Sequence, residues 1–354
     1  PPRDSIRRQR QMCIRDRAIP SDVADEAIGL RDRALEENIA YDVVESLTME
    51  VGPRPAGSAG DRAAVRWAVA KLEALGFENV RTEPVDIPNW ERGTLEVELT
   101  APFEQPLVAA SLGGSPGTPE PGIEAQIVRV ESLDELAALT RENLEGRIAF
   151  VDHVMERHKT GRGYGVSSAI RGCAHIKAAE RGALATLIRS AGTSHHRFAH
   201  TGGMLRGGSS AQIPGIALAN ADADILGYAV ASGAPVTVRL HSTARDLPPT
   251  QTANVMGEVP GRGRLKDEIV VMAAHLDSWD LGTGAIDDAT GVGVIVATAK
   301  MIMEHTDGPR RTLRVILYGA EEIGIYGGDQ YAERHADEIE KHIVALESDY
   351  GQGR

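Results

Sequence analysis

Three near-continuous apolar runs in the last third of the chain constrain the fold more than any other feature. They are EIVVMAAH (268–275), RTLRVILYGA (311–320) and KHIVALESD (341–349). Strands that are buried on both faces of a parallel sheet have this composition. Between the runs lie two segments with helical spacing, 289–304 and 326–341, which are long enough for right-handed crossovers. We therefore predict an α/β fold with a mostly parallel, mixed sheet flanked by helices.

The segment before these runs predicts a second domain inserted into the first. Residues 105–248 carry their own succession of strands and helices, between the glycine- and proline-rich stretch SLGGSPGTPEPG and the linker RDLPPTQTANV. Before the insert, apolar residues recur at helical spacing over 21–49 and 61–75. We predict a discontinuous first domain made of residues 18–104 and 249–354, with 105–248 as the inserted domain.

Charge and hydropathy limit the classes of partner. The formal net charge is −13, which argues against nucleic acid or an anionic membrane surface, because both select basic proteins. No run of about 18 apolar residues is present, so no membrane span is expected. Residues 1–17 are rich in arginine and lack the apolar centre of a secretory signal, and we interpret them as a non-native or disordered tail. A small-molecule or peptide substrate fits this composition better.

Each apolar run delivers residues that can bind a metal. His275 ends the first run, Glu321 and Glu322 follow the second, and Asp349 ends the third. Ligands of open α/β sheets collect outside the carboxyl ends of the strands. An imidazole with several carboxylates and no thiolate suits Zn²⁺ first and Co²⁺ or Mn²⁺ as alternatives, whereas an all-oxygen set would indicate Mg²⁺ or Ca²⁺. The sequence therefore predicts a zinc site at this edge of the sheet.

Two neighbouring features indicate hydrolytic chemistry. Asp277, two residues after His275, is placed to accept the other ring N–H of the imidazole and so to fix its tautomer. The side chains of Glu321 and Glu322 leave the chain in different directions, so one carboxylate can bind metal while the other faces a water molecule. A carboxylate in that place can take the proton of a metal-activated water. We predict hydrolysis without a covalent intermediate.

Four motifs in this order, HLDSWD, GAIDD, GAEEIG and ESDYG, resemble the co-catalytic zinc aminopeptidase family, and most closely its carboxypeptidase Q branch. GPRPAGS near the start and GALATLIRS, HTGG and IPGIAL further on extend the resemblance over about residues 25–354. The resemblance implies the zinc exopeptidase fold, with a protease-associated domain inserted over the active site. It also implies a metal-dependent exopeptidase that hydrolyses small peptides or dipeptides, forms a homodimer and is secreted or periplasmic.

The resemblance further implies a role for each residue of the site. His275, Asp287 and Asp349 would hold one zinc ion, and Asp287 would bridge to a second zinc ion that Glu322 holds. Glu321 would be the general base.

Two more expectations follow from the family. The peptide bond between Asp287 and Asp288 would be cis. The second zinc ion of the family also takes a histidine from a downstream motif, and no histidine of this chain matches it. We therefore expect the chain to be truncated at its carboxyl end, to bind the second metal ion poorly and to have little activity.

Two other functions stay open from the sequence. A non-catalytic receptor-like or binding protein can have the same fold, although it would be expected to have replaced its metal ligands. A single-zinc glutaminyl cyclotransferase is the other, and the inserted domain counts against it. His195, His196 and His200 lie in a polar loop without carboxylates, and we do not expect them to bind metal.

Overall fold

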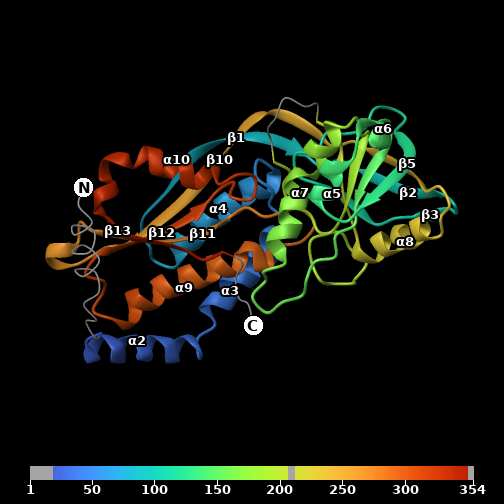
Figure 1. Ribbon diagram of the computed structural model, residues 1–354. Coiled ribbons are helices and arrows are strands. Elements are labelled where there is room, and N and C mark those ends of the chain that lie inside the picture. The colour runs from blue at the N-terminus through green and yellow to red at the C-terminus, as the bar shows by residue number, and fades with distance from the viewer. Residues whose placement is uncertain (1–18, 206–211, 350–354) are drawn as a thin grey trace, which may run out of the picture.

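The helices and strands form two units, each built on its own sheet (Figure 1). This computed structural model describes residues 19–205 and 212–349. The predicted tail, residues 1–17, lies outside the described residues. No described helix has the length and apolar character that crossing a membrane requires.

The first unit is built on a five-stranded sheet with the order β1-β10-β12-β11-β13. The strands are β1 (Glu78–Glu91), β10 (Arg245–Val259), β11 (Ile269–His275), β12 (Thr312–Tyr318) and β13 (His342–Glu347). β11 pairs in parallel with both β12 and β13, whereas β10 is antiparallel to β1 and β12. The mixed sheet is therefore confirmed, and its parallel half brings the carboxyl ends of β11, β12 and β13 to one edge.

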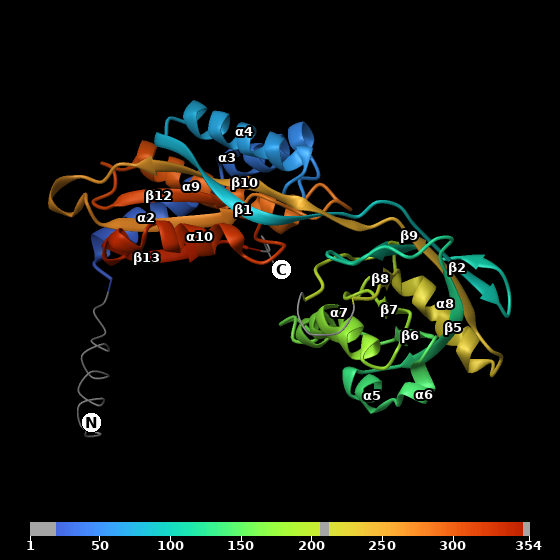
Figure 2. The same ribbon diagram turned by 90° about the horizontal axis from the view of Figure 1, so that it is seen from above.

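Helices cover both faces of this sheet (Figure 2). The α-helices of the first unit are α2 (Ser21–Ala34), α3 (Ile39–Ser46), α4 (Ala59–Ala74), α9 (Thr290–His305) and α10 (Tyr326–Arg334). Short π-helices cover Leu47–Val51 (η1) and Ala285–Ala289 (η3), and 3₁₀ turns cover Gly263–Leu265 (η2) and Ala336–Lys341 (η4). α3, α4 and α9 pack on one face with a common core, while Tyr331 of α10 packs on the other.

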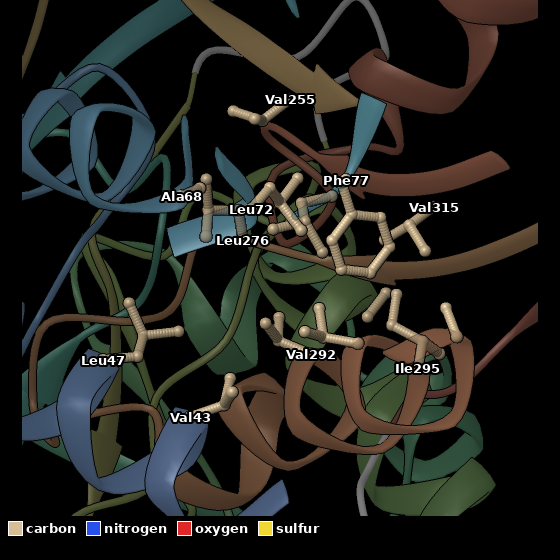
Figure 3. Packing of buried hydrophobic residues seen from close by; sticks show 14 of the residues in the cluster. Val43, Leu47, Ala68, Leu72, Phe77, Val255, Leu276, Val292, Ile295 and Val315 are labelled. Atoms are coloured by element: carbon tan, nitrogen blue, oxygen red, sulfur yellow. The ribbon is translucent and has the colours of Figure 1, made fainter. Parts of the chain in front are cut away.

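The main core lies between the α3, α4 and α9 layer and the sheet (Figure 3). Leu47 of η1, Leu72 of α4, Val292 of α9 and Val315 of β12 belong to this core, and all four are buried. Full burial of one such side chain contributes roughly 1.5–3 kcal/mol. This packing fixes α9, and it therefore also fixes η3, the short segment before α9 that carries Asp287.

The second unit is built on an eight-stranded sheet with the order β3-β2-β9-β5-β6-β7-β8-β4. Its strands are β2 (Leu95–Ala101), β3 (Gln105–Pro106), β4 (Ala109–Ser111), β5 (Ile123–Val130), β6 (Ile148–Val151), β7 (Ala185–Arg189), β8 (Gly215–Leu218) and β9 (Thr237–Ser242). Its helices are α5 (Leu133–Ala138), α6 (Arg141–Leu144), α7 (Tyr164–Ala179) and α8 (Asn220–Ala231). Two hydrophobic clusters of its own stabilise it.

The change from one sheet to the other comes earlier than the predicted boundary after residue 104. β2 precedes that boundary, yet it pairs with β9 in the second sheet. Its alternating pattern predicts a half-exposed strand but carries no information about which sheet the strand joins. On the return, β10 begins four residues before 249. Between the two sheets, the end of β1 (86–91) pairs with the start of β10 (245–251) as a two-stranded ribbon (Figure 2).

Candidate metal centre

The carboxyl ends of β11, β12 and β13 bring the predicted metal-binding residues together. His275 is the last residue of β11, and Asp349 follows β13 by two residues. Nε2 of His275 lies 2.9 Å from Oδ1 of Asp287 and 3.5 Å from Oδ1 of Asp349. One potential ligand atom from each of the three lies within 4.8 Å of the others, which is close enough for a single metal ion.

The imidazole of His275 is oriented by the main chain of Asp277. Nδ1 of His275 lies 3.0 Å from the carbonyl oxygen of Asp277, so a ring N–H at Nδ1 donates there and Nε2 faces the carboxylates. The prediction for Asp277 is wrong in one respect, because its carboxylate lies 3.8 Å from Nδ1 and does not accept that hydrogen bond. It instead accepts from the backbone N–H groups of Glu321 (2.9 Å) and Glu322 (3.3 Å). Asp277 therefore positions both the imidazole and the glutamate pair.

The two glutamates occupy different places beside the three ligand candidates. Oε2 of Glu321 lies 4.0 Å from Nε2 of His275. Burial and, to a smaller extent, neighbouring carboxylates raise the pKa of Glu321 to about 7 and the pKa of Glu322 to about 8. For Glu322 the negative charge of Asp287 is the strongest neighbouring contribution to the raised pKa. The carboxylates of Glu322 and Asp287 are therefore close enough to repel each other.

Asp288 links η3 to β11. Its carboxylate accepts hydrogen bonds from the backbone N–H groups of Gly291 (2.9 Å) and His275 (3.3 Å). Burial raises the pKa of Asp288 to about 7. The peptide bond between Asp287 and Asp288 is cis, which confirms the expectation from the resemblance.

Arg54 is a part of the centre to which we assigned no role from the sequence. It is fully buried, and its guanidinium donates to the carbonyl oxygens of Leu276, Thr283 (2.7 Å) and Gly284 (3.0 Å). Burial lowers the pKa of Arg54 to about 10, so it stays protonated at neutral pH. It thereby ties the loop after β11 to the segment before α4. An arginine between two prolines, in GPRPAGS, is the sequence signal that could have identified it.

The centre holds more negative than positive charge, and this is the observation that fits a metal ion. His275 and Arg54 face six carboxylates, those of Asp277, Asp287, Asp288, Glu321, Glu322 and Asp349. Burial lowers the pKa of His275, but its hydrogen bonds with Asp287 and Asp349 outweigh this and raise it to about 12. A divalent cation at Nε2 would replace that proton and compensate the carboxylates. An imidazole nitrogen with carboxylate oxygens suits zinc.

A cavity of about 710 Å³ opens beside the centre, between the two units. The first unit lines it with Ser278, Trp279 and Glu322, and the second lines it with Gly113 and residues of α7. The units approach closely here, since a Cβ added to Gly113 would lie 2.1 Å from the Trp279 ring. A cavity of this size at a junction between domains is a common place for a small ligand.

The histidines at 195, 196 and 200, which we did not expect to bind metal, lie in the second unit. Nδ1 of His195 is 4.0 Å from a carboxylate oxygen of Asp224, and the ring of His196 stacks on Phe198. Over residues 19–205 and 212–349, the group of His275, Asp287 and Asp349 is the one found with metal-binding geometry.

Comparison with known proteins gives the family. Residues 254–352 match Peptidase family M28. Carboxypeptidase Q from Bos taurus is 32% identical over 330 residues, which are 93% of this chain and 68% of that protein. The crystal structure of a peptidase M28 precursor from Shewanella amazonensis SB2B is 45% identical, with a TM-score of 0.90 over 93% of this chain and 75% of that chain.

A more distant structure shares the fold alone. BSAP, a zinc aminopeptidase from Bacillus subtilis, has a TM-score of 0.64 at 21% identity, over 88% of this chain and 69% of that chain. The mixed α/β fold with flanking helices is therefore common to this chain and both solved structures. With these relatives, the chain is a metal-dependent exopeptidase and belongs to peptidase family M28.

Proposed function

We propose that the chain hydrolyses small peptides at a centre of two zinc ions. His275, Asp287 and Asp349 would hold the first ion, and the 4.8 Å grouping of their ligand atoms supports this. Asp287 would bridge to a second ion held by Glu322, and the repulsion between these two carboxylates supports it. The surplus of carboxylates around His275, at the wall of a 710 Å³ cavity, is the observation that carries the proposal. The homodimer and the secreted or periplasmic location rest on the resemblance alone.

When bound, zinc polarises a carbonyl oxygen and makes water a better nucleophile near neutral pH. We assign the proton transfers to Glu321. Its carboxylate lies next to the three ligand candidates of the first ion, 4.0 Å from Nε2 of His275, and is not one of them. In this place it can take one proton from the attacking water and deliver it to the leaving amine as the peptide C–N bond breaks.

Two other residues act by position. Asp277 holds the backbone N–H groups of Glu321 and Glu322, and so it fixes where both side chains begin. Arg54 holds the loop after β11 through three carbonyl oxygens. The second unit supplies the opposite wall of the cavity and can exclude bulk water from a bound peptide.

The substitution Glu321→Gln tests this assignment, with Glu333→Gln on the exposed side of α10 as its control. We expect Glu321→Gln to lower kcat for a dipeptide such as Ala-Ala by about 10²–10⁴-fold, because the general base is removed. Zinc content, measured by mass spectrometry of the metal, should not change. Wild-type turnover in Glu321→Gln would contradict the assignment. A wild-type protein that binds zinc and peptide without hydrolysis would instead favour the receptor-like alternative.

A further inference from the structure

Most of the charged residues that line the cavity have a partner of opposite charge. Glu91 binds Arg245 at 2.5 Å, and Asp280 binds Arg92 at 2.5 Å. These pairs leave little net charge for a ligand. Arg171 of α7 differs, because among the described lining residues it is the cation without a carboxylate partner. α7 lies on the side of the second unit nearest the first (Figure 1, Figure 2).

Arg171 is held only by neutral groups. Its Nη1 donates to the hydroxyl of Tyr164 (3.1 Å) and the carbonyl oxygen of Thr201 (3.4 Å), and its Nη2 donates to the hydroxyl of Ser168 (3.4 Å). The guanidinium also lies over the Tyr164 ring, 5.6 Å from its centroid. Among residues 19–205 and 212–349, its buried Nε has no hydrogen-bond partner and no carboxylate lies within 4.0 Å of the guanidinium.

A guanidinium in this state is suited to an anionic ligand. It carries five N–H donors in a planar fork that matches the two oxygens of a carboxylate. A partly buried cation with an unsatisfied donor is costly, and a bound carboxylate would remove that cost. The neutral partners around Arg171 hold its side chain in place without neutralising its charge.

Gly202 makes room for this arrangement. A Cβ added to Gly202 would lie 2.5 Å from the guanidinium carbon of Arg171. Gly202 also has a φ of 136°, which disfavours any residue that has a side chain. Gly202 belongs to the segment HTGG, to which we assigned no role from the sequence.

The next residue, Gly203, sets an upper limit on the distance from Arg171 to the main chain of Glu322. A Cβ added to Gly203 would lie 4.0 Å from the carbonyl oxygen of Glu322. Consecutive Cα atoms are about 3.8 Å apart, so the guanidinium carbon lies no more than roughly 13 Å from the Glu322 main chain. Extended peptide spans about 3.3–3.6 Å for each residue. The distance therefore suits a peptide of two or three residues.

We infer that Arg171 is the residue that binds the terminal carboxylate of the peptide substrate. This inference rests on the proposed hydrolysis of small peptides and adds to it a residue that determines specificity. The guanidinium could also accept a carboxylate from an acidic side chain, and the experiment distinguishes the two sources.

The test compares Arg171→Met and Arg171→Lys with the wild type and with Arg141→Met, an exposed arginine of α6 paired with Glu145. The substrates are Ala-Ala, Ala-Ala-amide, Ala-Glu-amide and Ala-Gln-amide. We expect the wild type to prefer Ala-Ala over its amide by roughly 10- to 100-fold in kcat/KM, the range of one hydrogen-bonded charge. Arg171→Met should remove this preference mainly through a raised KM, Arg171→Lys should restore part of it, and Arg141→Met should keep it.

Two outcomes would overturn the inference. One is that Arg171→Met lowers kcat/KM equally for Ala-Ala and its amide, or for neither. The other is that Arg171→Met removes a preference for Ala-Glu-amide over Ala-Gln-amide and leaves Ala-Ala unaffected, which would assign Arg171 to an acidic side chain. Gly202→Ala, which displaces the guanidinium without removing it, should reproduce the effect of Arg171→Met, and a melting temperature near that of the wild type shows that each variant folds.

Binding separates this inference from the proposed function. In protein treated with EDTA, calorimetric titration with Ala-Ala and with Ala-Ala-amide should show tighter binding of the free acid, and Arg171→Met should abolish the difference. If the wild type has this preference but hydrolyses neither peptide with zinc, the proposed function fails and the role of Arg171 stands. If it hydrolyses both peptides equally and binds them equally, the role of Arg171 fails alone.

Discussion

The two ends of β12 carry charged clusters of opposite character. Near its start, Arg314 donates to Glu258 (2.8 Å) and Glu338 (2.7 Å) in a cluster that pairs its own charges. Just after its end, the carboxylates of the metal centre outnumber the cations. Burial acts to raise the pKa of Glu338, but the hydrogen bond and charge of Arg314 lower it to about 2, whereas burial raises the pKa of Glu322 to about 8.

The difference shows that the direction of a pKa shift carries more information than its size. Structural ion pairs and functional sites both perturb titrating groups. In the Arg314 cluster the carboxylate pKa is low because a cation is already present. In the metal centre the pKa values of Glu321 and Glu322 are high because burial and neighbouring carboxylates outweigh the charge of His275. A raised carboxylate pKa beside a histidine and a cavity therefore points to a ligand.

Replacing a glutamate by glutamine should change kcat very differently at the two ends of β12, and this is the largest effect that we expect. Glu322→Gln removes a proposed metal ligand, and we expect kcat for Ala-Ala to fall by about 10²-fold or more, because metal ions supply several kcal/mol of transition-state stabilisation. Glu338→Gln removes a carboxylate from the Arg314 cluster and should leave kcat within about twofold of the wild type. Steady-state kinetics with added zinc would measure both. Equal losses in the two variants would remove the functional distinction between the clusters.

Removing the cation of the paired cluster should mainly affect folding. Arg314→Met leaves Glu258 and Glu338 without their partner, and breaking a buried pair in this way costs about 3–5 kcal/mol. Urea unfolding at pH 7 would measure the change in the free energy of unfolding. Arg311→Met is the matched control, because its pair with Glu268 is more exposed and contributes about 1 kcal/mol or less. A loss below 1 kcal/mol in Arg314→Met would show that its cluster is not stabilising.

The metal centre should make the metal-free protein less stable as the pH rises. The pKa values of Glu321 and Glu322 in the folded state, about 7 and about 8, lie above the ordinary value of 4.5. Between pH 4.5 and 8 the folded state therefore binds more protons than the unfolded chain, and its stability falls as these protons are lost. We expect the melting temperature in EDTA to fall from pH 5 to pH 8, by roughly 2–4 °C for each kcal/mol.

Zinc should reduce that fall, because it binds the deprotonated carboxylates of the folded state. Melting curves at pH 5, 6, 7 and 8, with EDTA or with zinc, would compare the two conditions. A melting temperature that rises with pH in EDTA would contradict the charge imbalance.

The parts of the molecule that local sequence encodes were predictable. The apolar runs predict strands buried on both faces, which is confirmed for β11 and β12 and wrong for β13, an edge strand with mostly exposed side chains. All three strands are nevertheless parallel, so the residues after them meet at one edge. His275 and Asp349 illustrate this, and so does the cis bond after Asp287 through the resemblance.

The rest depends on contacts between distant segments. Arg54 reaches a loop more than 200 residues away, and nothing in its neighbours in the sequence specifies that loop. The β2 segment has the pattern of any half-exposed strand, so its sheet could not be assigned. For Asp277 the right residue was chosen, but whether its side chain or its main chain meets the imidazole depends on how the loop turns after His275.

The zinc content of the purified protein tests the charge imbalance most directly. Wild type, Asp349→Asn and Glu338→Gln would be loaded with zinc, dialysed at pH 8 and analysed by mass spectrometry of the metal. We expect wild type and Glu338→Gln to retain stoichiometric zinc and Asp349→Asn to lose most of it. Equal zinc in wild type and Asp349→Asn, or none in the wild type, would contradict a metal centre at the carboxyl ends of β11, β12 and β13.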